Sequence, residues 1–473
     1  LELDEAYNTY PAPGRAMDVA RRLGADLFTH HDGVPTLRFW RGTWWTYTGQ
    51  HWEEYDMDEV KQKVWHRLDK VTYVKGGEDA KGEKTHVEWL PTQYKVAGAL
   101  EPLKMNHLVP SRVETPVWTG RGDAPGQSLI SMGNGLFDIT TRTLHNHTPH
   151  WFTTWSLPFD YDPGAQCPTW RKWLDQVFAH DRNAEQAAQE FVGYLLTGRK
   201  DIQKGLLLVG VPRGGKSTFN GVVTALMGGT QNVSAPGLDE LSDKFGLEHS
   251  VGKPLMILGD ARNAANGNNK AVERLLQIIG NDSLAVQRKN KPDWVGVLPA
   301  RVMISTNEVP KFVDSSGAIA TRFVAIYLKR SFEGAEDRTM PAKLRAELPG
   351  IFLWALEGLQ RLEKNNNRFT VPDTQAELLE SVREQAAPVR TFLETAYEVT
   401  HNESDFVLRS EVYRDYKGWC ADNGYHARSQ GSMAEAINAA AVVGVRCTQP
   451  RDPNDPKKKA PRRVTGIRKT NFF

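Results

Sequence analysis

Residues 210–217 read Gly-Val-Pro-Arg-Gly-Gly-Lys-Ser, and this stretch decides the fold that we expect for the chain. It matches the full G-x-x-x-x-G-K-S pattern of a phosphate-binding loop. An apolar strand is predicted just before it, at Leu206 to Val209, and a helix at Ser217 to Leu226. In this order the loop N–H groups and the helix N-terminus face the phosphates of a nucleotide. The stretch therefore predicts a nucleoside triphosphate site.

The residues of this loop have separate expected tasks. We expect Lys216 to reach the β- and γ-phosphates of the nucleotide and the hydroxyl of Ser217 to bind Mg²⁺. The glycines let the backbone come close to the phosphates. The predicted nucleotide-binding residues are Gly210, Pro212, Arg213, Gly214, Gly215, Lys216, Ser217 and Thr218.

Two further apolar runs end in polar residues that suit the same site. Pro254 to Leu258 is followed closely by Asp260, and Arg301 to Ser305 by Asn307. Short apolar runs separated by helices predict a parallel sheet covered on both faces. At the edge of such a sheet, Asp260 can organise Mg²⁺ and Asn307 can orient the attacking water. Most related ATPases carry two acids here, so whether Asp260 holds the metal, activates water or does both stays open.

Basic residues outside the loop suggest two more functions. Leu284 to Val297 has apolar flanks around a tip that carries Arg288, Lys289 and Lys291, which predicts a β-hairpin suited to a phosphate backbone. The alternative is a solvated basic turn. Arg322 is a candidate arginine finger acting on a neighbouring subunit's nucleotide. Its alternative is an ordinary ion-paired arginine.

The pattern along the chain predicts three domains. An α+β accessory domain is expected at residues 1–165, and an α/β ATPase core with leading and closing helices at 166–370. The third, at 385–473, combines helical patterns with a basic ribbon, because nine Lys and Arg residues lie between Arg446 and Lys469. That combination predicts a winged helix. Helices are expected at 58–68, 168–180, 185–197, 351–362, 389–399, 409–423 and 432–441, and short strands and turns at 37–55 and 129–147.

Composition excludes several classes of protein. The chain has 473 residues, of which 40% are hydrophobic and 25% charged, so it is neither disordered nor collagen-like. No run approaches the roughly 20 apolar residues of a membrane span. Its three distant cysteines favour a reducing cytoplasm over a disulfide framework or a zinc site. Residue 1 is Leu, so we expect a segment of a longer chain, with any primase upstream of it.

Asp160 and Asp162 imitate the paired metal-binding carboxylates of a polymerase. Such a site needs a third acid and a histidine on adjacent strands, and the sequence offers no convincing set. The Asp162-Pro163 pair favours a turn. We therefore expect no polymerase activity from these residues.

Taken in order, the motifs resemble those of superfamily 3 helicases, and more narrowly those of phage, plasmid and poxvirus primase-helicases. The core motifs are the loop, the strand with a single acid, Gly280-Asn281-Asp282 before the hairpin, Ser305-Thr306-Asn307-Glu308 and Arg322-Phe323. Residues 134–163 resemble the domain that precedes such cores, and residues 412–424 resemble their C-terminal winged helix. The chain departs from the family at Asn281, where a small residue is commoner.

The resemblance implies a ring, usually a hexamer, that moves 3′→5′ along single-stranded DNA and hydrolyses ATP between subunits. It implies that Lys216 and Ser217 bind ATP and Mg²⁺, that Asp260 is the acidic metal-site residue and that Asn307 is the sensor. Arg322 would be the finger, and the hairpin tip would grip single-stranded or forked DNA.

Two other functions stay open at this point, and so do the partners. One alternative is a P-loop kinase or signalling ATPase with no nucleic-acid role. The other is a replication adaptor with a degenerate loop, against which the intact Gly215-Lys216-Ser217 argues. A primase or another replication protein is the expected partner. The expected location is the cytoplasm of a prokaryotic or phage-infected cell.

Overall fold

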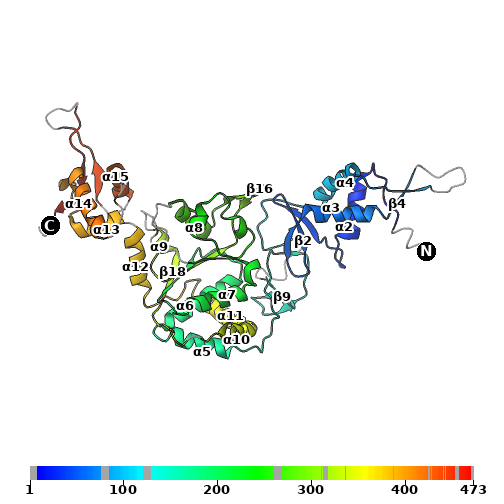
Figure 1. Ribbon diagram of the computed structural model, residues 1–473, viewed down its shortest axis with the longest axis horizontal. Coiled ribbons are helices and arrows are strands. Elements are labelled where there is room, and N and C mark those ends of the chain that lie inside the picture. The colour runs from blue at the N-terminus through cyan, green and yellow to red at the C-terminus, as the bar shows by residue number, and fades with distance from the viewer. Residues whose placement is uncertain are drawn as a thin grey trace.

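A computed structural model shows three units that follow one another along the chain, with the unit built on a parallel sheet between the other two (Figure 1). No helix within its described ranges is both long and apolar enough to cross a membrane. The structure describes residues 8–75, 85–120, 129–259, 269–310, 312, 318–335, 337–386, 388–423, 427, 429–439, 442, 444–452 and 458–469.

The first unit is a mixed α+β structure. Its main sheet has the order β3-β2-β1-β6, and three helices pack around one apolar cluster that includes Leu23, Trp44 and Leu103. A second small sheet, β10-β9-β8, contributes Phe137 to the core of the next unit instead. The elements are α2 (Ala16–Leu27), β1 (Leu37–Trp40), β2 (Thr43–Tyr47), β3 (Trp52–Tyr55), α3 (Met57–Leu68), β4 (Thr72–Val74), β5 (His86–Glu88), α4 (Gln93–Asn106), β6 (Leu108–Val109), β7 (Val117–Trp118), β8 (Leu129–Met132), β9 (Gly135–Asp138), β10 (Leu144–His145) and β11 (Trp151–Phe152).

The middle unit is built on a five-stranded parallel sheet with the order β13-β14-β17-β12-β18. Its elements are α5 (Pro168–Val177), α6 (Arg182–Leu196), β12 (Gly205–Gly210), α7 (Lys216–Leu226), β13 (Val233–Ser234), β14 (Leu255–Gly259), α8 (Asn269–Gly280), β15 (Leu284–Arg288), β16 (Lys291–Gly296), β17 (Arg301–Thr306), α9 (Ala318–Thr321), β18 (Phe323–Leu328), α10 (Met340–Ala346), α11 (Leu348–Lys364) and α12 (Gln375–Ala386).

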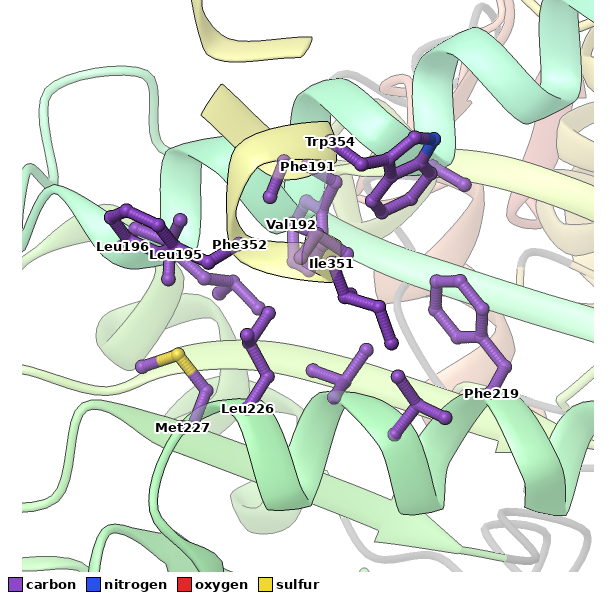
Figure 2. Packing of buried hydrophobic residues seen from close by; sticks show 14 of the residues in the cluster. Phe191, Val192, Leu195, Leu196, Phe219, Leu226, Met227, Ile351, Phe352 and Trp354 are labelled. Carbon is purple, nitrogen blue, oxygen red and sulfur yellow. The ribbon is translucent and has the colours of Figure 1, made fainter. Parts of the chain in front are cut away.

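The sheet is covered on both faces, which explains why its strands are continuously apolar. Side chains alternate along a strand, so Leu206 and Leu208 face one cluster while Leu207 and Val209 face the other. On the first face, α6, α7 and α11 interlock; Figure 2 shows Phe191, Phe219 and Trp354 among the side chains that meet there. The second face is covered by α8, the β15–β16 hairpin and α12.

The last unit combines three helices with short strands around Phe392, Tyr416 and Val464. Strands β20, β22 and β21 lie side by side in that order, and β19 pairs antiparallel with β23. The winged helix predicted for this part of the chain stays a prediction. The elements are α13 (Pro388–Ala396), β19 (Tyr397–Val399), β20 (Phe406–Leu408), α14 (Arg409–Asp422), α15 (Gln430–Ala439), β21 (Arg446–Thr448), β22 (Arg463–Thr465) and β23 (Ile467–Lys469).

Most of the predicted elements are present, and two are partly wrong. The helix predicted at 168–180 ends at Val177. The helix predicted at 389–399 ends at Ala396, because Tyr397 to Val399 pair with β23 as a strand. Helices α2, α4, α8, α9, α10 and α12 were not predicted. Asp162 lies in a turn, as expected, where its carboxylate accepts a hydrogen bond of 2.8 Å from the Gly164 N–H.

Close packing of α6 on α11 yields the first prediction. A methyl group at Gly193 would lie 2.3 Å from the carbonyl oxygen of Ala355, and backbone atoms cannot move aside as a flexible side chain can. Gly193→Ala should lower the free energy of unfolding of the core by about 3 kcal/mol, as overpacking typically does. Denaturant unfolding followed by fluorescence measures this.

Gly221→Ala is the matched control, because a methyl group there meets open space on α7. It should leave stability unchanged or raise it by about 0.5–1 kcal/mol. Equal effects of the two substitutions would contradict the packing described for α6 and α11.

Candidate nucleotide-binding site

The glycine-rich loop joins β12 to α7 in a conformation that needs glycine. Gly215, immediately before α7, has a φ of +94°. A methyl group there would also lie 3.0 Å from Cζ2 of Trp173. At Gly214, a methyl group would lie 2.9 Å from the carbonyl oxygen of Val211. Trp173 and the Val211 carbonyl thus pack closely against these two glycines of the loop. The loop also borders the cavity described in the next paragraph.

The loop borders a cavity of about 450 Å³ that can hold a nucleotide. Asn307 follows β17, the strand that pairs directly with β12, and it lines this cavity together with Lys216 and Ser217. Its far wall comes from α5 and from the segment that follows β18. The lining residues are Trp173, Gln176, Pro212, Arg213, Gly214, Gly215, Lys216, Ser217, Thr218, Asn307, Phe332, Ala335, Asp337 and Met340.

Lys216 lies over the loop in a position from which it can turn to a phosphate. Its Nζ donates hydrogen bonds to the carbonyl oxygens of Gly210 at 2.7 Å and Val211 at 2.8 Å. These are neutral acceptors, whereas phosphate oxygens are charged and form stronger bonds with an ammonium group. The charge and the glycine cradle together fit a triphosphate.

The segment after β18 is fastened to the loop. The Phe332 N–H donates to the carbonyl oxygen of Arg213 at 3.1 Å, and the Ser331 hydroxyl donates to that of Pro212, also at 3.1 Å. Phe332 and Met340 give this wall an apolar surface. Apolar side chains beside a phosphate-binding loop are suited to contact a nucleobase. Sequence reasoning missed this wall, because no spacing motif marks it.

Sheet register brings the strand ends together at the loop. Val209 of β12 lies opposite Thr306 of β17, and Gly259 of β14 lies opposite Ser305. The carboxyl ends of all three strands therefore lie at the edge of the sheet that borders the cavity. Asp260 follows Gly259 and lies outside the described residues, so its predicted part in the Mg²⁺ site, shared with Ser217, stays a prediction. Within the described ranges, no three His, Cys, Asp or Glu side chains gather as a metal site.

Arg322 lies at the opposite edge of the sheet from the loop. It directly precedes β18, and its carbonyl oxygen accepts from Gly205 N at the start of β12, at 2.8 Å. Six residues of strand, about 20 Å at 3.3 Å each, therefore separate it from the loop. Its Nη1 donates to Gln203 Oε1 at 3.0 Å. Arg322 thus cannot contact the nucleotide of its own subunit.

A second cation accompanies Arg322. Lys204 donates a hydrogen bond through Nζ to the carbonyl oxygen of Thr321. Burial lowers the pKa of Lys204, and the nearby charge of Arg322 lowers it further. Sequence reasoning overlooked Lys204. Its position just before the apolar strand β12 could have placed it at the same edge of the sheet as Arg322, which just precedes β18.

The predicted hairpin exists, but its basic side chains do not all face solvent. Strands β15 and β16 pair antiparallel, with Asn290 in the tight turn at a φ of +59°. Arg288 and Lys291 both form ion pairs with Glu54 of β3. Lys289 is exposed, and its side chain has no ion pair within the described part of the chain. The contact with DNA predicted for these residues stays a prediction, and for Arg288 it requires the pair with Glu54 to open.

Two family models match parts of this chain. Residues 40–179 match a model described as D5 N terminal like, and residues 208–322 match a family of unknown function, DUF5906. The first match covers β2, β3 and β6 of the main sheet of the N-terminal unit, but only the last residue of β1, and it ends just after α5. It supports the resemblance to the primase-helicase family that the motifs indicate.

Solved structures resemble the whole chain. An apo structure of the NrS-1 C terminal region has a TM-score of 0.51 at 11% sequence identity, and the alignment covers 96% of this chain and 99% of that chain. An A form apo structure of the same region has a TM-score of 0.46 at 10% identity, with 91% and 97% covered. At such identity the likeness concerns the fold alone.

The loop geometry yields a prediction on nucleotide affinity. Gly215→Ala places a methyl group against Trp173 and forces alanine into a left-handed backbone conformation. The loop must then shift, and we expect the affinity for an ATP analogue to fall at least about tenfold, or 1.4 kcal/mol. Titration with a fluorescent analogue measures this.

Gly221→Ala on α7 is the control and should bind the analogue as the unaltered chain does. Equal affinity of the two variants would refute the proposed binding of phosphates by the glycine-rich loop.

Proposed function

We propose that this chain is an ATP-dependent DNA helicase, the helicase part of a primase-helicase, which acts as a ring and moves 3′→5′ along single-stranded DNA. The observation that carries the proposal is the placement of the phosphate loop and Arg322 at opposite edges of one parallel sheet. Each subunit therefore carries the nucleotide-binding half of a hydrolytic site at one edge of its sheet and the finger half at the other. Stacking subunits head to tail completes the sites, and a closed ring is the symmetric way to do so.

Within a subunit, we assign nucleotide binding to the loop and water positioning to Asn307. Lys216 binds the β- and γ-phosphates, and Asn307 hydrogen-bonds the attacking water. Ser217 and Asp260 would hold Mg²⁺, which supplies charge neutralisation of the phosphates when it is bound. The cavity lining around Lys216, Ser217 and Asn307 supports these roles.

Arg322 acts on the nucleotide of the neighbouring subunit. Its guanidinium stabilises charge that develops on the transferred phosphoryl group, a contribution of about 10³- to 10⁵-fold in rate where it is supplied by a partner. The position of Lys204 beside it gives this edge of the sheet two cations. Hydrolysis thereby depends on the subunit contact, which couples it to movement.

The hairpin and the C-terminal unit supply two places for DNA. The hairpin tip carries Arg288, Lys289 and Lys291, of which Lys289 is exposed. In the C-terminal unit, exposed basic residues lie on β21 and next to β22, among them Arg446 and Arg462. Cations arranged along a path suit a phosphate backbone without selecting a base sequence. The match of residues 40–179 to the D5 N terminal like model supports a place for the chain among primase-helicases, and hence a role in replication.

Mixing two inactive variants tests the function and the shared site together. Lys216→Ala lacks the phosphate-binding cation and Arg322→Ala lacks the finger, so each alone should lose at least about 10³-fold in ATP turnover. In an equal mixture, roughly a quarter of the head-to-tail interfaces join an intact loop to an intact finger. We expect DNA-stimulated phosphate release to return in the mixture only.

Failure of the mixture to recover would exclude Arg322 as a finger acting between subunits. Turnover retained by Lys216→Ala alone would refute the nucleotide site. ATP turnover that DNA does not stimulate in the unaltered chain would favour a kinase or signalling ATPase instead.

Lys289 provides the cleanest test of the hairpin, because its side chain takes no part in the pair with Glu54. Lys289→Ala should weaken binding to single-stranded DNA and reduce the slope of log affinity against log salt by about 0.7, the value for one phosphate contact. Basal ATP turnover should change much less than DNA binding. Anisotropy titrations at several salt concentrations give the slope; an unchanged slope would remove Lys289 from the DNA interface.

A further inference from the structure

The tip of the β15–β16 hairpin lies against the N-terminal unit instead of standing free. Arg288 Nη1 donates to Glu54 Oε1 at 2.8 Å, and Lys291 Nζ donates to Glu54 Oε2 at 2.7 Å. Arg288 Nη2 also donates to the hydroxyl of Thr43 at 3.1 Å. One carboxylate therefore receives hydrogen bonds from two of the three basic side chains at the tip.

Burial makes this contact more than a surface ion pair. The side chain of Arg288 is only 3% exposed, whereas that of Glu54 is 31% exposed. An exposed ion pair contributes little to stability, but a buried arginine that loses its partner is costly. The guanidinium of Arg288 is thus fixed by the contact and is closed off from any other ligand while the contact lasts.

A second contact beside the first involves the turn between β1 and β2. The guanidinium of Arg41 lies over the ring of Trp294 on β16, with 4.9 Å between its Cζ and the ring centroid, and over the ring of Trp40 at 4.5 Å. A methyl group at Gly42 would lie 3.5 Å from Cβ of Pro292. The turn and the hairpin are therefore in van der Waals contact over several residues.

We propose that this contact is an autoinhibitory clamp in which the carboxylate of Glu54 occupies the place of a nucleic-acid phosphate. In the closed clamp, Arg288 and Lys291 share the single negative charge of Glu54. A polynucleotide opens it by offering its phosphates to the same two side chains, which releases the hairpin from β2 and β3. The inference rests on the DNA role proposed above for the hairpin.

The chemistry of the contact favours this competition. A carboxylate and a phosphate are both oxygen anions, and a guanidinium binds either one through the same N–H groups. Arg288 cannot serve both at once, because its side chain is buried against Glu54. The apparent affinity for DNA is then lowered by the fraction of molecules in which the clamp is open.

Lys289 gives the DNA a first point of attachment. It lies at the turn between the two clamped residues, it is exposed, and its N–H donates to Glu248 Oε2 at 3.2 Å through the backbone only. A strand can therefore contact Lys289 before the clamp opens. Lys289 thus attracts the DNA strand first, and Arg288 and Lys291 bind it after the clamp has opened.

Glu54→Gln is the direct test, with Glu53→Gln as its matched control. Both substitutions remove one negative charge from β3, but Glu53 points to the opposite face of the strand and has no ion pair within the described residues. We expect Glu54→Gln to bind single-stranded DNA about tenfold more tightly, with basal ATP turnover unchanged. Glu53→Gln should bind like the unaltered chain.

A reversible cross-link tests the clamp independently of any change in charge. Cysteines at positions 42 and 292 would have Cβ atoms about 3.5 Å apart, within the range of a disulfide. In the full chain with Cys447→Ser added, because Cys447 is partly exposed, oxidation of Gly42→Cys/Pro292→Cys should lower DNA affinity about tenfold. A reductant should restore it. The single variant Pro292→Cys should respond to neither treatment.

The outcomes separate the clamp from the proposed function. Tighter binding by Glu54→Gln alone, with loss on cross-linking, supports the clamp. Equal binding by both glutamine variants and an unaffected cross-linked form would show a passive contact and would overturn the clamp, while the DNA role survives. If no form binds single-stranded DNA, the DNA role falls and the clamp with it.

Discussion

Parallel register is the constraint on which the rest of this molecule depends. Because β12, β14 and β17 run in the same direction and are aligned to within a residue, whatever follows each of them meets at one edge. The loop with Lys216 follows β12 and Asn307 follows β17. The same rule sends Arg322, which precedes β18, to the far edge. The sheet thus places Lys216 and Arg322, the proposed phosphate-binding residue and the proposed finger, at opposite ends of its strands.

The central strands and the phosphate loop could be predicted from sequence because their signals are local. Leu206 to Val209 and Val302 to Ile304 are apolar without interruption, and such a run in a strand requires cover on both faces. The glycines of the loop are dictated by backbone geometry, which the pattern records directly. Asn307 was placed at the cavity for the same reason, since it follows a predicted strand.

Other features could not be predicted because they depend on residues far apart in the chain. Glu54 and Arg288 are separated by 234 positions, and nothing in the composition of the hairpin indicates an acidic partner on β3. Tyr397 to Val399 continue a helical pattern, yet pairing with β23 overrides it. Helix α4 contains Pro102 and shows little separation of polar and apolar faces, so its pattern is weak.

The pairing of β19 with β23 has a consequence for how the C-terminal unit is attached. The unit enters through α13 and β19, and the last described strand returns to lie beside that entry. A unit whose first and last described strands pair with each other can be exchanged between proteins. The exchange neither exposes an unpaired strand nor disrupts the core of the adjacent unit. Such a connection allows this unit to be replaced without a change in the unit built on the parallel sheet.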